Sequence, residues 1–334
     1  MRWIWVAALV AWMLSAGPAV GGESVRFVVL GDTQGDETVP VSVDALSKVV
    51  TDSLAADPPI QFVVVVGDLV DGSDSCGPLA DQYRQWRAVA DGWYQGDLFG
   101  CKIYPLPGNH DQKNPFTYRQ SWQTVFSELP DNGPASRKKL NYSFDVGPCH
   151  LVAVDTSESG VFWAHWVDLD WLEQDLASSD RPVKLVFGHE PAYKVELDRV
   201  ASMDSRPPIR DRFWSILAQN NVRAYFCGHD HGYDHWIKDN VHQIITAGGG
   251  GAGMYHYTIV DADETDVTVT VIQEPENTVF DQYKLSEAQD VPNEDRSAND
   301  YSYWPYNAVL CNWVGLLGIV MVCSSLQLLK ETRP

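Results

Sequence analysis

The chain has 334 residues, enough for one large domain or two ordinary ones, and its 45% apolar content can form a substantial core. The formal net charge of −21 argues against nucleic acid or an anionic membrane surface as a partner, because such partners require a basic protein surface. An acidic protein that handles an anionic substrate needs a local positive centre, and bound metal ions would supply one.

The first 22 residues are typical of a secretory signal peptide. Arg2 precedes an apolar run from Trp3 to Leu14, and small residues follow from Ser15 to Gly22, where cleavage is expected. Because a single positive charge precedes the apolar run, a non-cleaved anchor stays open as the alternative.

From Val25 onward, strand and helix patterns alternate, which predicts an α/β fold. Strands are expected at residues 25–30, 61–66, 102–106, 141–145, 150–155, 183–187, 223–226, 241–247, 255–261 and 267–273. Helices are expected at residues 42–56, 79–89, 168–176 and 210–218. The polar stretch after residue 111 is expected to be irregular, and the main folded domain is expected to span residues 23–286.

Five of the expected strands end in glycine, and a potential metal ligand follows each glycine at once. The pairs are Gly31-Asp32, Gly67-Asp68, Gly108-Asn109, Gly188-His189 and Gly228-His229, the last extended by Asp230-His231. One such pair is an ordinary turn signal, but the carboxyl ends of neighbouring strands meet at one edge of a sheet. Carboxylate, amide and imidazole donors suit Mn, Fe or Zn, and these donors are too many for one tetrahedral ion. The sequence therefore predicts a site for two ions.

These blocks, in this order and over roughly Val25 to Val271, resemble the calcineurin-like metallophosphoesterase family. The resemblance implies an α/β sandwich of two mixed β-sheets flanked by helices. It also implies a dinuclear centre of divalent or trivalent transition metal ions (Mn, Fe or Zn) whose activated hydroxide hydrolyses a phosphoester.

The resemblance also implies roles for individual residues. Asp68 would bridge the two ions, and Asp32, Gln34 and His231 would hold the first ion. The second ion would be held by Asn109, His189 and His229. His110 would stabilise the transition state or protonate the leaving oxygen, and Asp71 would orient His110.

Three positions depart from the family pattern. Gln34 stands where the family usually has His, so its amide either ligates the ion or hydrogen-bonds to a water on it. Gly72 stands where the phosphoprotein phosphatase branch carries Arg. The block from His189 to Tyr193 is similar to the purple acid phosphatase branch of the family. That branch has a metal-binding tyrosine just after its second Gly-Asp pair, but here Leu69 follows Asp68.

The remaining histidines and basic residues have weaker signals. His235 is near enough to the motifs to contact substrate, whereas His150 and His165 are expected to be structural. His242 and His256 are expected on half-exposed strands. Four basic residues of the polar stretch either contact a phosphate or lie on solvated surface: Arg119, Arg137, Lys138 and Lys139.

Four cysteines of the body fit an exported protein and permit two disulfides with three possible pairings. Cys76 with Cys101 is one plausible pair, and Cys149 and Cys227 remain. All four are expected to be structural.

The C-terminal part is expected to tether the protein to a membrane. Residues 287–307 form an acidic linker, residues 308–329 an uncharged segment long enough to span a bilayer, and residues 330–334 a short basic cytoplasmic tail. A cleaved lipid-anchor signal is the alternative, because Ser297-Ala298-Asn299 precedes the apolar tail.

The sequence thus predicts a membrane-tethered hydrolase of small-molecule phosphoesters, foremost phosphomonoesters, on the cell surface or periplasmic face, with no nucleic-acid partner. One alternative is a phosphodiesterase that acts on nucleotides or on lipid or wall head groups. Another is a non-catalytic surface binding protein that retains the fold.

Overall fold

The computed structural model describes residues 23–94, 102–113, 117–157, 167–193, 202–251 and 253–287. The predicted signal peptide, membrane segment and tail lie outside these residues, as do nearly all of the linker, His165, Cys101 and the side chain of Cys76. Among the described residues, no helix combines the length and the apolar character needed to cross a membrane.

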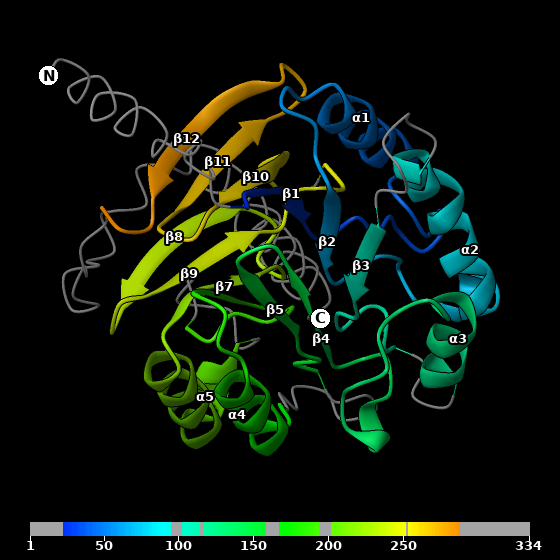
Figure 1. Ribbon diagram of the computed structural model, residues 1–334. Coiled ribbons are helices and arrows are strands. Elements are labelled where there is room, and N and C mark those ends of the chain that lie inside the picture. The colour runs from blue at the N-terminus through cyan, green and yellow to red at the C-terminus, as the bar shows by residue number, and fades with distance from the viewer. Residues whose placement is uncertain are drawn as a thin grey trace, which may run out of the picture. The chain divides into compact units, whose positions relative to one another are not determined.

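Two six-stranded sheets form the centre of the fold (Figure 1). The first sheet has the order β12-β11-β10-β1-β2-β3, in which β1 to β3 are parallel and the others antiparallel. Its strands are β1 (Val25–Leu30), β2 (Phe62–Val66), β3 (Lys102–Leu106), β10 (His256–Ala262), β11 (Val267–Gln273) and β12 (Thr278–Lys284).

The second sheet has the order β4-β5-β6-β7-β9-β8, with β5, β6, β7 and β9 parallel and an antiparallel strand at each edge. Its strands are β4 (Tyr142–Val146), β5 (Cys149–Ala153), β6 (Val183–Phe187), β7 (Val222–Cys227), β8 (Tyr233–Lys238) and β9 (Val241–Thr246). The predicted α/β fold with two mixed sheets is therefore confirmed.

Helices cover the outer faces of both sheets (Figure 1). Beside β1 to β3 lie α1 (Val43–Leu54), α2 (Leu79–Ala90) and α3 (Tyr118–Val125). Beside the second sheet lie α4 (Leu169–Ser178) and α5 (Pro207–Gln219). Short 3-10 turns occur at η1 (Asp74–Cys76), η2 (Asp91–Tyr94), η3 (Ala135–Arg137) and η4 (Met203–Ser205).

Alternate residues of the parallel strands in the second sheet belong to two different hydrophobic clusters, as the two-residue period of a strand requires. In β7, Phe226 joins the cluster between the two sheets, whereas Tyr225 joins the cluster beneath α4 and α5. Phe27 of the first sheet meets Phe187 of the second edge-on, with ring centroids 6.3 Å apart. The central strands of both sheets are thus buried on two faces, and polar loops lie at their ends, whereas the edge strand β12 is mostly exposed.

Three elements were not predicted. The stretch from Tyr118 to Val125 is a helix, although we expected irregular structure, because Tyr118, Trp122 and Val125 recur at helical spacing and pack on the core while the other side chains are polar. The ring of Trp122 packs edge-on against Tyr83 of α2, with centroids 5.4 Å apart. The two strands that were missed, β8 and β12, are each at the edge of a sheet.

The two described cysteine side chains are free thiols. Cys149 belongs to the cluster between the sheets and Cys227 to the cluster on the other face, so the pairing of these two is excluded. Burial raises the pKa of both thiols above the ordinary value, as expected for structural cysteines without a reactive thiolate.

Candidate metal centre

Five loops gather at the carboxyl ends of β1, β2, β3, β6 and β7, and each carries predicted ligands. Four of these ligands have left-handed backbone conformations, with φ of 57° at Asp32, 52° at Asp68, 74° at His229 and 44° at His231. Residues other than glycine adopt such angles at a cost of roughly 1 kcal/mol or more each, and strained residues of this kind cluster at functional sites. The strained backbone therefore indicates that the loops are held in conformations that position the predicted ligand side chains.

Asp68 is shared by two groups of potential ligand atoms. One group consists of Asp68, His189 and His229, and the other of Asp32, Asp68 and His231. Within each group, the potential ligand atoms lie within 4.8 Å of one another. These are the two sets expected for the second and the first ion, with Asp68 common to both.

Asn109 completes the group around His189 and His229. Its Oδ1 lies 3.0 Å from Nε2 of His189 and 2.8 Å from Nδ1 of His229. The other ring nitrogen of His189, Nδ1, donates to the carbonyl oxygen of Val66 at 2.8 Å. This bond fixes the tautomer and turns the lone pair of Nε2 toward the site, which is the usual arrangement behind a metal-binding histidine.

Gln34 lies in the group around Asp32 and His231. Its Nε2 is 3.3 Å from Oδ2 of Asp68 and 3.1 Å from Nε2 of His231, while its Oε1 is buried without a hydrogen-bond partner. Rotation of the amide by 180° would place the oxygen among the ligand atoms and remove the unsatisfied acceptor. Gln34 thus fits an ion at this position.

The charges of the group also fit bound cations. Asp32 and Asp68 are each 1% exposed. Burial raises the pKa of Asp32 well above its ordinary value, and the charge of Asp68 adds to this. Burial alone would lower the pKa of His189, but Asp68 raises it to about 10. Buried carboxylates need positive charge close by, and two cations between these side chains would provide it.

Glycines allow the loops to approach one another closely. A Cβ atom at Gly108 would lie 2.2 Å from Oδ1 of Asp68, and one at Gly228 would lie 2.4 Å from Oδ2 of Asp32. The backbone N–H of His229 donates to both carboxylate oxygens of Asp32, each at 3.0 Å. Gly108 and Gly228 therefore leave room for the carboxylate of another loop.

His110 and Asp71 lie beside the ligands. The backbone N–H of His110 donates to Oδ1 of Asp68 at 2.8 Å, and its Nε2 lies 4.0 Å from Oδ2 of Asp68. Its Nδ1 is 3.5 Å from Oδ1 of Asp71, which is too long for a hydrogen bond. All nine predicted site residues are thus brought together at one end of the sandwich.

A comparison with protein families agrees with this geometry. The model of the calcineurin-like phosphoesterase family matches residues 25–233, which is more than half of the chain. The chain belongs to this family.

Individual relatives are more distant. Acid phosphatase type 7 of Mus musculus is 27% identical over 166 residues, which cover 42% of this chain and 36% of the phosphatase, so the chain matches about a third of that relative. Purple acid phosphatase PPD1 from yellow lupin (Lupinus luteus) seeds superposes with a TM-score of 0.62 at 18% identity, covering 79% of this chain and 54% of that one. A dimetal phosphatase from Danio rerio superposes with a TM-score of 0.59 at 15% identity, covering 78% of this chain and 98% of that one.

One buried carboxylate beside the ligand loops, Asp111, was not among the predicted site residues. Oδ2 of Asp111 accepts the backbone N–H groups of Leu69 at 3.1 Å and Gly108 at 2.9 Å, and so joins the Asp68 loop to the Asn109 loop. Burial raises its pKa to about 8, and the charge of Asp68 adds to the effect. The position of Asp111, two residues after Asn109, is the feature of the sequence from which its role at the site could have been predicted.

A second buried group was not foreseen. Nη1 of Arg137 donates to Asp155 at 2.6 Å, and Gln112 donates to the other oxygen of Asp155 at 2.7 Å. Two residues on, Ser157 donates to Glu190, the neighbour of His189, at 2.9 Å. Arg137 is therefore part of the structure behind the ligand loops, and no local pattern in the sequence distinguishes it from a surface arginine.

The other basic residues of that stretch bond to groups outside the phosphoesterase site. Nη1 of Arg119 reaches the carbonyl oxygen of Ser136 at 3.4 Å, and Lys138 pairs with Asp131 at 2.6 Å. Lys139 donates to two backbone carbonyl groups of residues 127 and 129. These contacts favour a position of Arg119, Lys138 and Lys139 on the surface over contact with a phosphate.

Two predictions about the late histidines were wrong. His242 and His256 are buried, not half-exposed, because β9 and β10 lie inside the sandwich. His235 is held within the strands, where its ring stacks on Tyr283 at 4.0 Å and its Nε2 lies 2.8 Å from Nδ1 of His242. His150 is structural as expected, bound by Asp145 at 2.7 Å and Asp175 at 3.0 Å.

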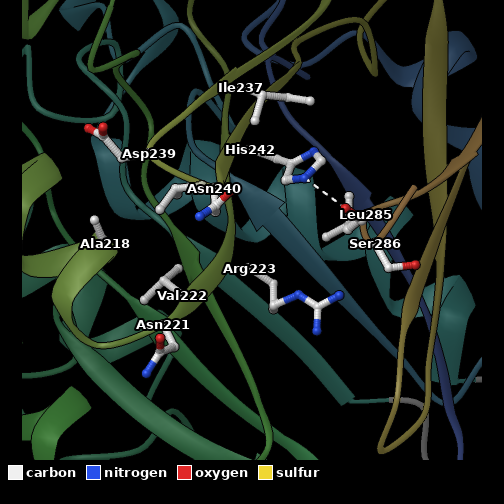
Figure 2. Close-up of a pocket in the computed structure, with 11 residues that line it drawn as sticks. Ala218, Asn221, Val222, Arg223, Ile237, Asp239, Asn240, His242, Leu285 and Ser286 are labelled. Atoms are coloured by element: carbon white, nitrogen blue, oxygen red, sulfur yellow. Dashed lines mark hydrogen bonds between the residues drawn. The ribbon is translucent and has the colours of Figure 1, made fainter. Parts of the chain in front are cut away.

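A cavity of about 280 Å³ lies elsewhere in the domain (Figure 2). It is at the amino end of β7, around Val222 and Arg223, whereas the ligands follow the carboxyl end of that strand. Arg223 pairs with Asp266 at 3.3 Å, and Nε2 of His242 is 3.1 Å from the carbonyl oxygen of Leu285. None of the predicted ligands lines this cavity.

Proposed function

We propose that the protein hydrolyses phosphoesters, and phosphomonoesters in particular, with two metal ions held by the seven predicted ligands. These ligands are Asp32, Gln34, Asp68, Asn109, His189, His229 and His231. The observation that carries the proposal is the position of Asp68 within both groups of ligand atoms, since a carboxylate between two ions is the basis of a dinuclear centre.

Two bound ions would clamp the oxygens of the phosphoryl group and acidify the water that attacks phosphorus. The protein supplies the remaining parts. Asp68 and Asn109 are fixed by the close approach of their loops, so the phosphoryl group is held in one orientation. The side chain of His110 is 28% exposed, so its ring is accessible to a substrate and can donate a proton to the leaving oxygen.

Three relatives whose names support a preference for monoesters are an acid phosphatase, a purple acid phosphatase and a dimetal phosphatase. A fourth, 26% identical over 192 residues, is a probable cyclic nucleotide phosphodiesterase of Psychrobacter, which supports the diesterase alternative. The names belong to those proteins. For this chain, the shared ligand pattern and the accessible His110 support the same reaction class.

We also propose that the reaction takes place outside the cytoplasm on a membrane-tethered protein, on the basis of the apolar segments at residues 3–14 and 308–329. Proteolysis of intact cells tests this, since an exported body is degraded by an added protease while a cytoplasmic one is protected.

The decisive experiment is elemental analysis of the full-length protein in detergent, combined with assays of nitrophenyl phosphate and bis(nitrophenyl) phosphate in Mn²⁺, Zn²⁺ or Fe²⁺. About two ions per chain and faster turnover of the monoester would support the proposal. A preference for the bis-ester would make the protein a phosphodiesterase. Two bound ions without turnover of either ester would refute hydrolysis and indicate a binding protein.

A further inference from the structure

A lysine that the sequence analysis did not consider lies beside the proposed proton donor. Lys113 follows the Asn109 loop, and its backbone N–H donates to the carbonyl oxygen of His110 at 3.2 Å. Its Nζ donates to Oδ1 of Asp71 at 2.8 Å. The side chain of Lys113 is 40% exposed, whereas that of Asp71 is only 6% exposed. A cation at the surface is thus anchored to a carboxylate beneath it.

Lys113 and His110 approach the same oxygen atom. Oδ1 of Asp71 receives the ammonium group at 2.8 Å, and Nδ1 of His110 lies 3.5 Å from it with no hydrogen-bond partner. The other oxygen of Asp71 accepts the backbone N–H of Ser73 at 3.2 Å. Lys113 thus holds the carboxylate that faces Nδ1 of His110, so Asp71 connects the lysine to the imidazole.

The backbone around Gly72 leaves no room for a side chain at position 72, and therefore none for a cation from that position. Gly72 has a φ of 71°, and a Cβ atom there would lie 1.9 Å from the carbonyl oxygen of His110. The same atom would be 3.5 Å from Cβ of Lys113, so the side chain of Lys113 starts beside the place where a side chain at position 72 would start. Lys113 therefore reaches the space that residue 72 cannot fill.

We propose that Lys113 is a specificity-determining residue whose ammonium group binds a non-bridging oxygen of the substrate's phosphoryl group and so favours dianionic monoesters over monoanionic diesters. The inference rests on the proposed function and names the feature of that site which selects the substrate charge. When substrate binds, Nζ leaves Asp71 for the phosphoryl group, and Asp71 then accepts a hydrogen bond from Nδ1 of His110. The flexible stem of lysine permits this movement.

The charge difference sets the size of the effect. A monoester dianion carries one more negative charge than a diester, and charge-assisted hydrogen bonds are about twice as strong as neutral ones. We expect a loss of about tenfold or more for the monoester and less than about threefold for the diester.

The test compares Lys113→Met and Lys113→Arg with wild type, using the full-length, Mn²⁺-loaded protein and both nitrophenyl esters. Lys238→Met is the matched control, because the side chain of Lys238 is 41% exposed and its Nζ lies 3.6 Å from Oδ2 of Asp239. Lys238 ends β8, whereas His231 precedes the start of that strand. We expect Lys113→Met to lower kcat/KM selectively for the monoester, Lys113→Arg to restore most of it, and the control to behave as wild type. Equal losses for both esters, or failure of Arg to restore the rate, would overturn the proposal.

A binding measurement separates this proposal from the proposed function. The affinity of inorganic phosphate, measured by calorimetry, should fall about tenfold in Lys113→Met, while the metal content remains that of wild type. This comparison is valid even if the wild-type protein turns over neither ester, an outcome that would refute hydrolysis alone. Unchanged phosphate affinity in Lys113→Met would refute the role of Lys113.

Discussion

Replacement of Gly108 by alanine tests whether the close approach of two loops holds the metal ligands in place. The new Cβ atom would lie 2.2 Å from Oδ1, 2.5 Å from the backbone nitrogen and 2.9 Å from Cγ of Asp68. A carbon atom and an oxygen atom need about 3.3 Å, so Asp68 must move by roughly 1 Å. Asp68 lies between both ligand groups and cannot move without disturbing both.

The expected cost follows from that displacement. Misplacement of a reacting group by about 1 Å can lower the rate by about 10²-fold, and disturbing the residues behind metal ligands lowers metal affinity by about 10–100-fold. Overpacking costs about 1–3 kcal/mol of stability, so the variant should still fold. We therefore expect Gly108→Ala to bind Mn²⁺ at least tenfold more weakly in calorimetry and to lose about 99% of kcat/KM.

The control is Gly92→Ala, because a Cβ atom there meets only a methyl group of Val50, at 2.9 Å. Gly92 lies in the turn η2, which carries none of the predicted ligands. Circular dichroism of both variants verifies the fold. If Gly108→Ala binds two ions with wild-type affinity and retains full activity, the inference that contact between these loops positions Asp68 is wrong.

Three further predictions concern the ligands and the structure behind them. Asp68→Ala should lose both metal and activity, whereas His110→Ala should keep two ions in elemental analysis and lose about 10²–10⁴ in rate; full rate in His110→Ala would refute its role. Burial alone would lower the pKa of His150, but its two aspartate partners raise it, so this histidine stabilises the fold fully below its unfolded pKa of about 6.5 and loses that effect as pH rises through the folded pKa. His150→Asn should therefore lower the free energy of unfolding in urea more at about pH 5.5 than at about pH 8.5, and an equal loss would contradict this. Arg137→Met should destabilise by about 3–5 kcal/mol, since Asp155 is completely buried, and a urea midpoint equal to that of wild type would exclude this buried pair as a determinant of stability.

The sequence was sufficient to predict that these residues lie together, because the expected ligands come directly after strands. A strand such as Phe62–Val66 is apolar throughout, so both its end and the first polar residue beyond it, Asp68, are unambiguous. The parallel order of the strands then brings five such loops together. Each ligand is thus positioned by a local signal and a general rule of sheet geometry.

What could not be predicted depends on contacts between distant segments. Strands β8 and β12 exist because each pairs with a neighbour at the edge of a sheet, and α3 because Trp122 packs on α2. The pair of Arg137 and Asp155 joins residues 18 apart that have no shared pattern. Lys113 and Asp71, 42 residues apart, meet only after both loops are in place.

The ligands of the proposed centre come from both sheets of the sandwich. Asp32, Asp68 and Asn109 follow strands of the first sheet, whereas His189, His229 and His231 follow strands of the second. Ions bound there would cross-link two layers that are otherwise joined by apolar packing and a few hydrogen bonds. Metal binding and the cohesion of the sandwich would then be thermodynamically linked, so the ions would serve the stability of this end of the fold as well as its chemistry.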